Sequence, residues 1–207
     1  MLQIIFLRKK FKLQMKILYL FIFMNLTFLC YSQTNNNFIE EFRSLKENKT
    51  LKQEKELLVR INHPDYSEKI LYLFYESNQW KGKYYFYHAG DGLIVTELKF
   101  NLNKKNDLSS DLSCGDIFWN LLKSKNVFSL PNDSEIFIKE KVNNYQDLHY
   151  NKIYLYVKEN SLENNLSFSN FEANVENFAQ LEEFKIYEEI LDLIQNEFQV
   201  NFRSAWN

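Results

Sequence analysis

Three short runs of aromatic and β-branched residues in the middle of the chain constrain the fold most. They are Ile70–Tyr75, Lys83–His88 and Leu93–Phe100, and turn-forming residues separate them at 77–79 (Ser-Asn-Gln) and 90–92 (Gly-Asp-Gly). Runs of this composition favour extended strands, and such short connections join strands that pair antiparallel. We therefore predict a three-stranded antiparallel meander in this part of the chain.

The other apolar residues follow helical or alternating patterns. Three- and four-residue spacing is clearest over Val175–Phe198, where acidic residues lie off the apolar stripe, as in a helix that packs on a sheet. Ser113 and Asp116 have the spacing of a capping box, which predicts that a further helix begins there. The expected elements are helices at 38–45, 50–61, 113–125 and 175–198, a strand at 135–142, and a hairpin of strands 152–158 and 166–171.

The order of these elements predicts the fold class. Strands joined by hairpins, rather than alternating with helices, favour an α+β domain over a doubly wound fold. We expect an antiparallel sheet of about six strands, made of the meander and the later hairpin, packed by amphipathic helices and with a long C-terminal helix. The chain has 207 residues, 45% of them hydrophobic, which is enough for one such domain over 33–207.

The first 32 residues have the features of a signal peptide. They contain five basic and no acidic residues, and the 13-residue apolar run Ile17–Leu29 has the length of a signal-peptide core. Small side chains before Gln33 predict cleavage between Ser32 and Gln33, and therefore export to the periplasm or the medium. Because the segment from Met15 is by itself a complete signal, we hypothesise that translation starts there.

Two other fates of this segment remain open. As an uncleaved helix it would tether the domain to the membrane, although the apolar run spans only about 20 Å and is short for a bilayer. Lipidation at Cys30 is the other alternative, but the bulky pair Phe28-Leu29 precedes that cysteine where a lipobox has a small residue. In each case we expect membrane contact only through the N-terminal segment.

Charge argues against a nucleic-acid partner. Cleavage before Gln33 would leave 20 basic and 27 acidic residues, a formal charge of −7. A chain of this sign lacks the basic surface that neutralises phosphates. We therefore expect no nucleic-acid partner.

The sequence carries no recognised catalytic or cofactor motif. The phosphate-binding, dinucleotide-binding, nucleophile-elbow and zinc-protease patterns are absent from it. His63, His88 and His149 have no second ligand at metal-binding spacing. We therefore predict no cofactor and no metal, and we name no catalytic residue. Whether the protein is an enzyme stays open, although the absence of these motifs favours a protein that is not one.

An aromatic stretch at 80–88 (WKGKYYFYH) is the candidate binding surface. Alternation along a strand places Tyr85 and Tyr87 on one side, while Trp80 lies in the turn before them and His88 at the strand end. One side of such a strand can fill the core, and the other can stack on a sugar ring or a peptide. The competing interpretation is that all these rings pack against neighbouring strands.

Three segments carry a resemblance to known proteins. The signal ending in CYSQ, the stretch DIFWNLLKSKNVFSLPNDSEI and the closing amphipathic helix are similar to small exported proteins of unknown function in Gram-negative bacteria. The resemblance covers about half of the exported chain. It implies export and assigns no activity.

We hypothesise a non-enzymatic structural or binding role in the periplasm or outside the cell. Its partner would be a protein or a carbohydrate. One alternative is a small exported hydrolase that uses dispersed Asp, Glu or His residues. The other is a carbohydrate- or peptide-binding module that uses the aromatic strand, with Trp80, Tyr85, Tyr87 and His88 as its ligand-binding residues.

Overall fold

The computed structural model describes residues 37–47, 53–63, 67–100, 113–141 and 151–200. The chain divides into two compact units, Met1–Ser44 and Leu45–Asn207. In the first unit the described residues, 37–44, are helical, as the sequence predicts. The predicted signal segment lies outside the described residues. No helix within the described ranges is both long and apolar enough to span a bilayer.

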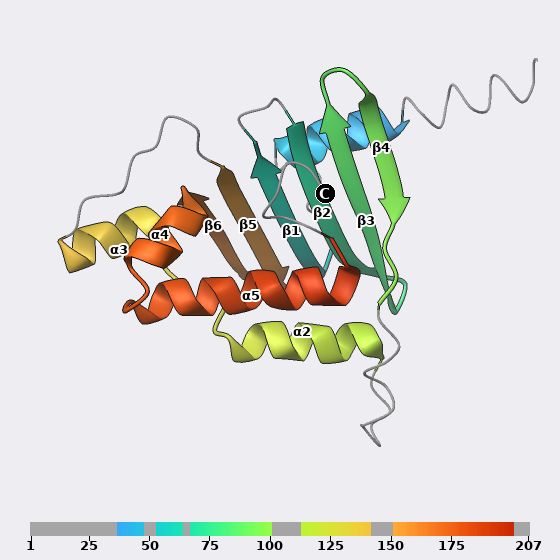
Figure 1. The fold of residues 1–207 in the computed structure, drawn as a ribbon. Helices are drawn as coiled ribbons and strands as arrows, with labels where there is room; N and C mark the ends of the chain where they lie inside the picture. Colours follow the sequence, from blue (N-terminus) through green and yellow to red (C-terminus); the bar gives the residue numbers. More distant parts are fainter. Residues whose placement is uncertain (1–36, 48–52, 64–66, 101–112, 142–150, 201–207) are drawn as a thin grey trace, which may run out of the picture. The chain divides into compact units, whose positions relative to one another are not determined.

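The second unit contains a six-stranded antiparallel sheet, which confirms the predicted α+β class (Figure 1). The order across the sheet is β4-β3-β2-β1-β5-β6. The predicted meander forms β2, β3 and β4, and the predicted later hairpin forms β5 and β6. The strands are β1 (Lys55–Asn62), β2 (Ser67–Glu76), β3 (Gln79–His88), β4 (Gly92–Glu97), β5 (Lys152–Glu159) and β6 (Leu162–Ser169).

The first meander turn explains the register of β2 and β3. Ser77 and Asn78 have positive φ angles of 54° and 61°, as a two-residue type I′ hairpin turn requires. Glu76 therefore lies opposite Gln79, and the pairing continues to Ser67 opposite His88.

Four helices follow β4 in the described sequence. Ser113 and Asp116 form the predicted capping box at the start of α2. The predicted helix 175–198 is interrupted between two shorter helices, and its long C-terminal part is α5. The helices are α2 (Cys114–Ser124), α3 (Asp133–Glu140), α4 (Phe171–Asn177) and α5 (Glu182–Phe198).

Two segments have the opposite secondary structure from the one predicted. The helix expected at 50–61 is wrong over its described part, because Lys55–Asn62 is strand β1. The strand expected at 135–142 is also wrong, because Asp133–Glu140 is helix α3. In α3 the backbone N–H of Asn132 donates to Glu135 Oε2 at 2.7 Å, which fixes the helix start despite the alternating Ile136 and Ile138.

The main core lies between one face of the sheet and the helices. Leu57, Val59 and Ile61 of β1 point into it and are fully buried, together with Phe118 and Trp119 of α2 and the apolar side of α5. The opposite face of β1 and β2 is buried as well, and it includes polar residues. Glu56 on that face accepts a hydrogen bond from the Tyr72 hydroxyl at 2.7 Å.

Two tryptophans connect α2 to the sheet. Their rings lie 5.0 Å apart, and each indole N–H donates to a carboxylate, Trp80 to Asp116 at 3.0 Å and Trp119 to Glu159 at 3.1 Å. Gly115 makes this contact possible, because a Cβ there would lie 2.3 Å from the Trp80 ring. The closeness of the two rings therefore depends on a glycine at the start of α2.

Glu159 predicts an acid dependence of stability. Burial alone would raise its pKa, but hydrogen bonds from Lys123 and Trp119 and the charges of Lys123 and Lys55 outweigh burial and lower the pKa. The ionised form is therefore stabilised in the folded state, and this contribution is lost as the pH falls below the ordinary value of 4.5. We expect the difference in unfolding free energy between wild type and Glu159→Gln, measured by urea denaturation, to be larger at neutral pH than at about pH 3. An equal difference at both pH values would contradict this assignment.

Candidate functional site

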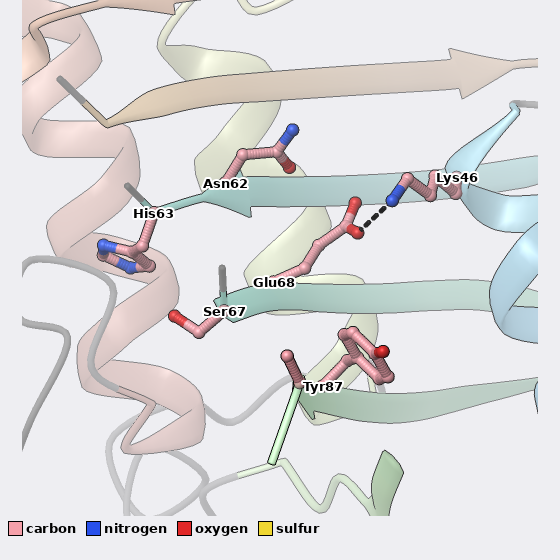
Figure 2. A pocket seen from close by; sticks show the side chains of 7 residues that line it. Lys46, Asn62, His63, Ser67, Glu68 and Tyr87 are labelled. Carbon is pink, nitrogen blue, oxygen red and sulfur yellow. Dashed lines mark ion pairs between the residues drawn. The ribbon is translucent and has the colours of Figure 1, made fainter. Parts of the chain in front are cut away.

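A cavity of about 350 Å³ opens where β1 ends, β2 begins and β3 ends (Figure 2). We call it the strand-end pocket. All of its lining residues belong to the second unit. They are Lys46, Asn62, His63, Ser67, Glu68, Tyr87 and Ala89.

Strand register brings three of the side chains together. Asn62 lies opposite Glu68, and Glu68 lies opposite Tyr87, so the three residues form one row on the same face of the sheet. His63 and Ser67 form the next cross-strand position, where the His63 N–H donates to the Ser67 carbonyl at 3.0 Å. Because side chains alternate along a strand, His63 and Ser67 leave the strands toward the opposite face, and Figure 2 shows His63 directed away from Glu68.

The carboxylate of Glu68 is the main charged group of the pocket. Its side chain is only 7% exposed, and Oε2 lies 2.7 Å from Lys46 Nζ. Oε1 lies 4.0 Å from Arg60 Nε, beyond hydrogen-bond distance. Arg60 is held in place because its guanidinium lies over the Tyr154 ring at 4.1 Å and also donates to the Lys46 carbonyl.

Two buried acceptors at the pocket are unused within the described residues. Glu68 Oε1 and Asn62 Oδ1 are both almost completely buried and have no hydrogen-bond partner in that part of the chain. Leaving a buried acceptor unpaired costs about 1–3 kcal/mol. Both atoms belong to side chains that line the same cavity, so a bound molecule with hydrogen-bond donors would satisfy them.

The four residues predicted to bind a ligand do not come together. Tyr87 lines the pocket and is 38% exposed. Tyr85 is fully buried, and Trp80 packs on Trp119 at the far end of β3. His88 lies opposite Ser67 but is not among the lining residues, and its Nδ1 is 3.2 Å from Asp91 Oδ2. A ligand role for Trp80, Tyr85 and His88 stays a prediction.

Most of the pocket was not indicated by the sequence. His63 stood out only as a turn histidine, and Lys46, Asn62, Ser67 and Glu68 belong to no motif. His149 lies outside the described residues. Within the described ranges, no cluster of three or more His, Cys, Asp or Glu side chains is arranged to hold a metal ion.

Comparison with known proteins adds no homologue. No family model, no curated protein and no solved structure matches the chain. Any function for the strand-end pocket therefore has to be argued from its own geometry.

Proposed function

We propose that the protein is an exported, non-enzymatic binding protein whose strand-end pocket takes a small polar molecule. The observation that carries the proposal is the pair of buried acceptors, Glu68 Oε1 and Asn62 Oδ1, that line one cavity without a partner among the described residues. Export is supported by the basic and apolar pattern of residues 1–32 and by the resemblance to small exported proteins.

The size of the pocket supports a small molecule rather than a protein surface. Its volume of about 350 Å³ lies at the lower end of the range for small-molecule sites, roughly 300–1,000 Å³. The lining combines the Tyr87 ring with several polar groups that differ in charge and hydrogen-bonding capacity. Such a lining favours recognition of a polar molecule by shape and hydrogen bonding.

A hydrolase is the second candidate, because an imidazole, a hydroxyl and a carboxylate line the same pocket. Nucleophilic catalysis of this type needs the acid to orient the histidine that activates the hydroxyl. Here His63 and Ser67 are a cross-strand pair, whereas Glu68 leaves β2 toward the other face and pairs with Lys46. This arrangement favours binding over hydrolysis.

A ligand screen with matched variants tests the proposal. Protein from expression of the full chain would be screened by thermal shift against a mixed library of sugars, amino acids, amines, organic acids and short peptides. We expect at least one compound to raise the melting temperature of the wild type, and this shift to be lost in Glu68→Gln. Glu76→Gln is the control, because Glu76 is on the same strand and also pairs with a lysine, Lys81, but lies away from the pocket.

Each result of the screen has a defined meaning. Absence of any stabilising compound would contradict the binding proposal. Equal loss of the shift in Glu68→Gln and Glu76→Gln would contradict the location of the site. Chemical conversion of a bound compound, detected by mass spectrometry and lost in His63→Ala, would replace the binding proposal with the hydrolase.

A further inference from the structure

We infer that the ligand of the strand-end pocket is a neutral polyhydroxylated ring, a saccharide unit, with neighbouring hydroxyls donating to Glu68 Oε1 and Asn62 Oδ1. This inference rests on the proposed binding function and names the ligand class.

The unused atoms require donors. Glu68 Oε1 is a carboxylate oxygen and Asn62 Oδ1 is an amide carbonyl oxygen, so each accepts hydrogen bonds and neither donates. A carboxylate, sulfate or fully ionised phosphate has only acceptors and would leave both atoms unpaired. The ligand must therefore present hydroxyl or amine hydrogens to this side of the pocket.

The spacing of the two residues calls for two donors on neighbouring atoms. Asn62 and Glu68 are directly opposite each other in the β1–β2 register. Side chains at such positions start with their Cβ atoms about 4.5–5.5 Å apart. Two hydroxyls on adjacent ring carbons can reach both acceptors from one molecule.

Charge disfavours an amine as the source of the donors. Lys46 and Arg60 both lie beside Glu68, and Lys152 is opposite Asn62 on the next strand. Two cations therefore flank the Glu68 carboxylate, and a third is paired with Asn62 across the strands. An ammonium group would be repelled by them, whereas a neutral hydroxyl can donate to Glu68 and accept from Lys46, whose side chain is half exposed.

Tyr87 supplies an apolar wall of the kind a sugar ring can use. It is opposite Glu68 on β3, lines the pocket and is one of the few large apolar side chains that remain exposed in the described residues. An exposed aromatic ring offers a flat surface to the C–H side of a pyranose while polar groups bind the hydroxyls. An aromatic ring beside hydrogen-bonding side chains therefore favours a saccharide over a linear polyol.

Calorimetric titration of the full protein tests the ligand class with three sets of probes. The first set is neutral sugars (glucose, mannose, galactose, N-acetylglucosamine and their disaccharides) with the matching deoxy sugars. The second is amines (spermidine and argininamide), and the third is anions (citrate and inorganic phosphate). We expect binding in the first set, and loss of one critical hydroxyl in a deoxy sugar to weaken binding about tenfold or more.

Two tyrosine variants separate ring stacking from the Tyr87 hydroxyl. We expect Tyr87→Leu to weaken sugar binding about fivefold to tenfold, and Tyr87→Phe to retain most of it, because the phenyl ring is kept. Glu76→Gln is expected to bind like the wild type. The deoxy-sugar comparison uses wild-type protein, so it remains decisive even if a pocket variant fails to fold.

The failure of this inference is distinguishable from failure of the proposed function. Binding of amines or anions at the pocket, without binding of sugars, would overturn the saccharide class and leave the binding function in place. Binding of sugars that is insensitive to every single-hydroxyl deletion and to Tyr87→Leu would overturn the assigned contacts. Absence of binding in all three sets, together with an empty library screen, would overturn both.

Discussion

Replacement of Trp119 by alanine is expected to lower the free energy of unfolding by about 3–5 kcal/mol, the range for removal of a buried tryptophan ring. Trp119 is only 1% exposed and is the largest fully buried side chain in the described part of the chain. Its ring contacts Trp80 on the sheet side and Phe128 after α2, at centroid distances of 5.0 Å and 6.4 Å. The variant would therefore leave a cavity at the junction of α2 with the sheet.

The hydrogen bond from the indole adds to this loss. Trp119 Nε1 donates to Glu159 Oε1, and Glu159 also pairs with Lys123. Alanine would remove the donor and expose the carboxylate to a new cavity. Trp119→Phe would keep an aromatic ring at this position but remove the N–H. Its loss of unfolding free energy should therefore be smaller than that of Trp119→Ala, and should reflect the missing hydrogen bond and the smaller ring.

Urea denaturation followed by circular dichroism measures these differences. The control is Leu121→Ala, a residue of the same helix whose side chain is 40% exposed. We expect that change to alter the free energy of unfolding by at most about 1 kcal/mol. Equal unfolding midpoints for Trp119→Ala and Leu121→Ala would show that the tryptophan junction is not a main source of stability.

Local signals in the sequence were sufficient for the meander and for α2. The pair Ser77-Asn78 tolerates the positive φ angles of a hairpin turn, and Ser113 with Asp116 caps the first turn of α2. Such features act over a few residues and are therefore visible in one sequence. They also support the α+β class, because the meander strands are joined by short turns.

β1 and α3 were assigned wrongly because their burial departs from the usual pattern. In β1 both faces are buried, and Glu56 is accommodated by the hydroxyl of Tyr72, a contact from the next strand that composition does not reveal. In α3 the alternating isoleucines suggested a strand, but Ile138 is 79% exposed and Ile136 fully buried. The two errors left the total of six strands unchanged, so the correct count did not depend on correct elements.

The strand-end pocket could not be predicted from local patterns. Asn62, Glu68 and Tyr87 meet through the pairing of β1 with β2 and of β2 with β3, and Lys46 joins them through its ion pair with Glu68. The helix expected at 50–61 ends just before Asn62, so the wrong assignment of β1 also hid the register that places Asn62 opposite Glu68. Tyr87 alone was recognised, because an aromatic strand is visible without knowledge of its neighbours.

Two side chains at the start of α3 bind the outer edge of β6. The Ser167 N–H donates to Asn132 Oδ1 and the Ser169 N–H donates to Asp133 Oδ2, both at 2.8 Å. Burial raises the pKa of Asp133, and hydrogen bonds from the Ser169 and Ser134 backbone oppose this rise. The two side chains therefore occupy positions that a neighbouring strand would otherwise take.

Simultaneous replacement of Asn132 and Asp133 by alanine is expected to lower the free energy of unfolding by about 2–4 kcal/mol, from two lost hydrogen bonds and a weakened helix start. The control is Ser134→Ala, because Ser134 is the next residue of α3 and is exposed. This variant should change the free energy of unfolding by at most about 0.5 kcal/mol.

Amide hydrogen exchange gives the local readout, because exchange at Ser167 and Ser169 should accelerate in the double variant more than global unfolding explains. If exchange at these two amides rose only with global unfolding, the side chains would not be what protects this edge. Faster exchange accompanied by concentration-dependent aggregation would mean that α3 also prevents pairing of β6 with other chains.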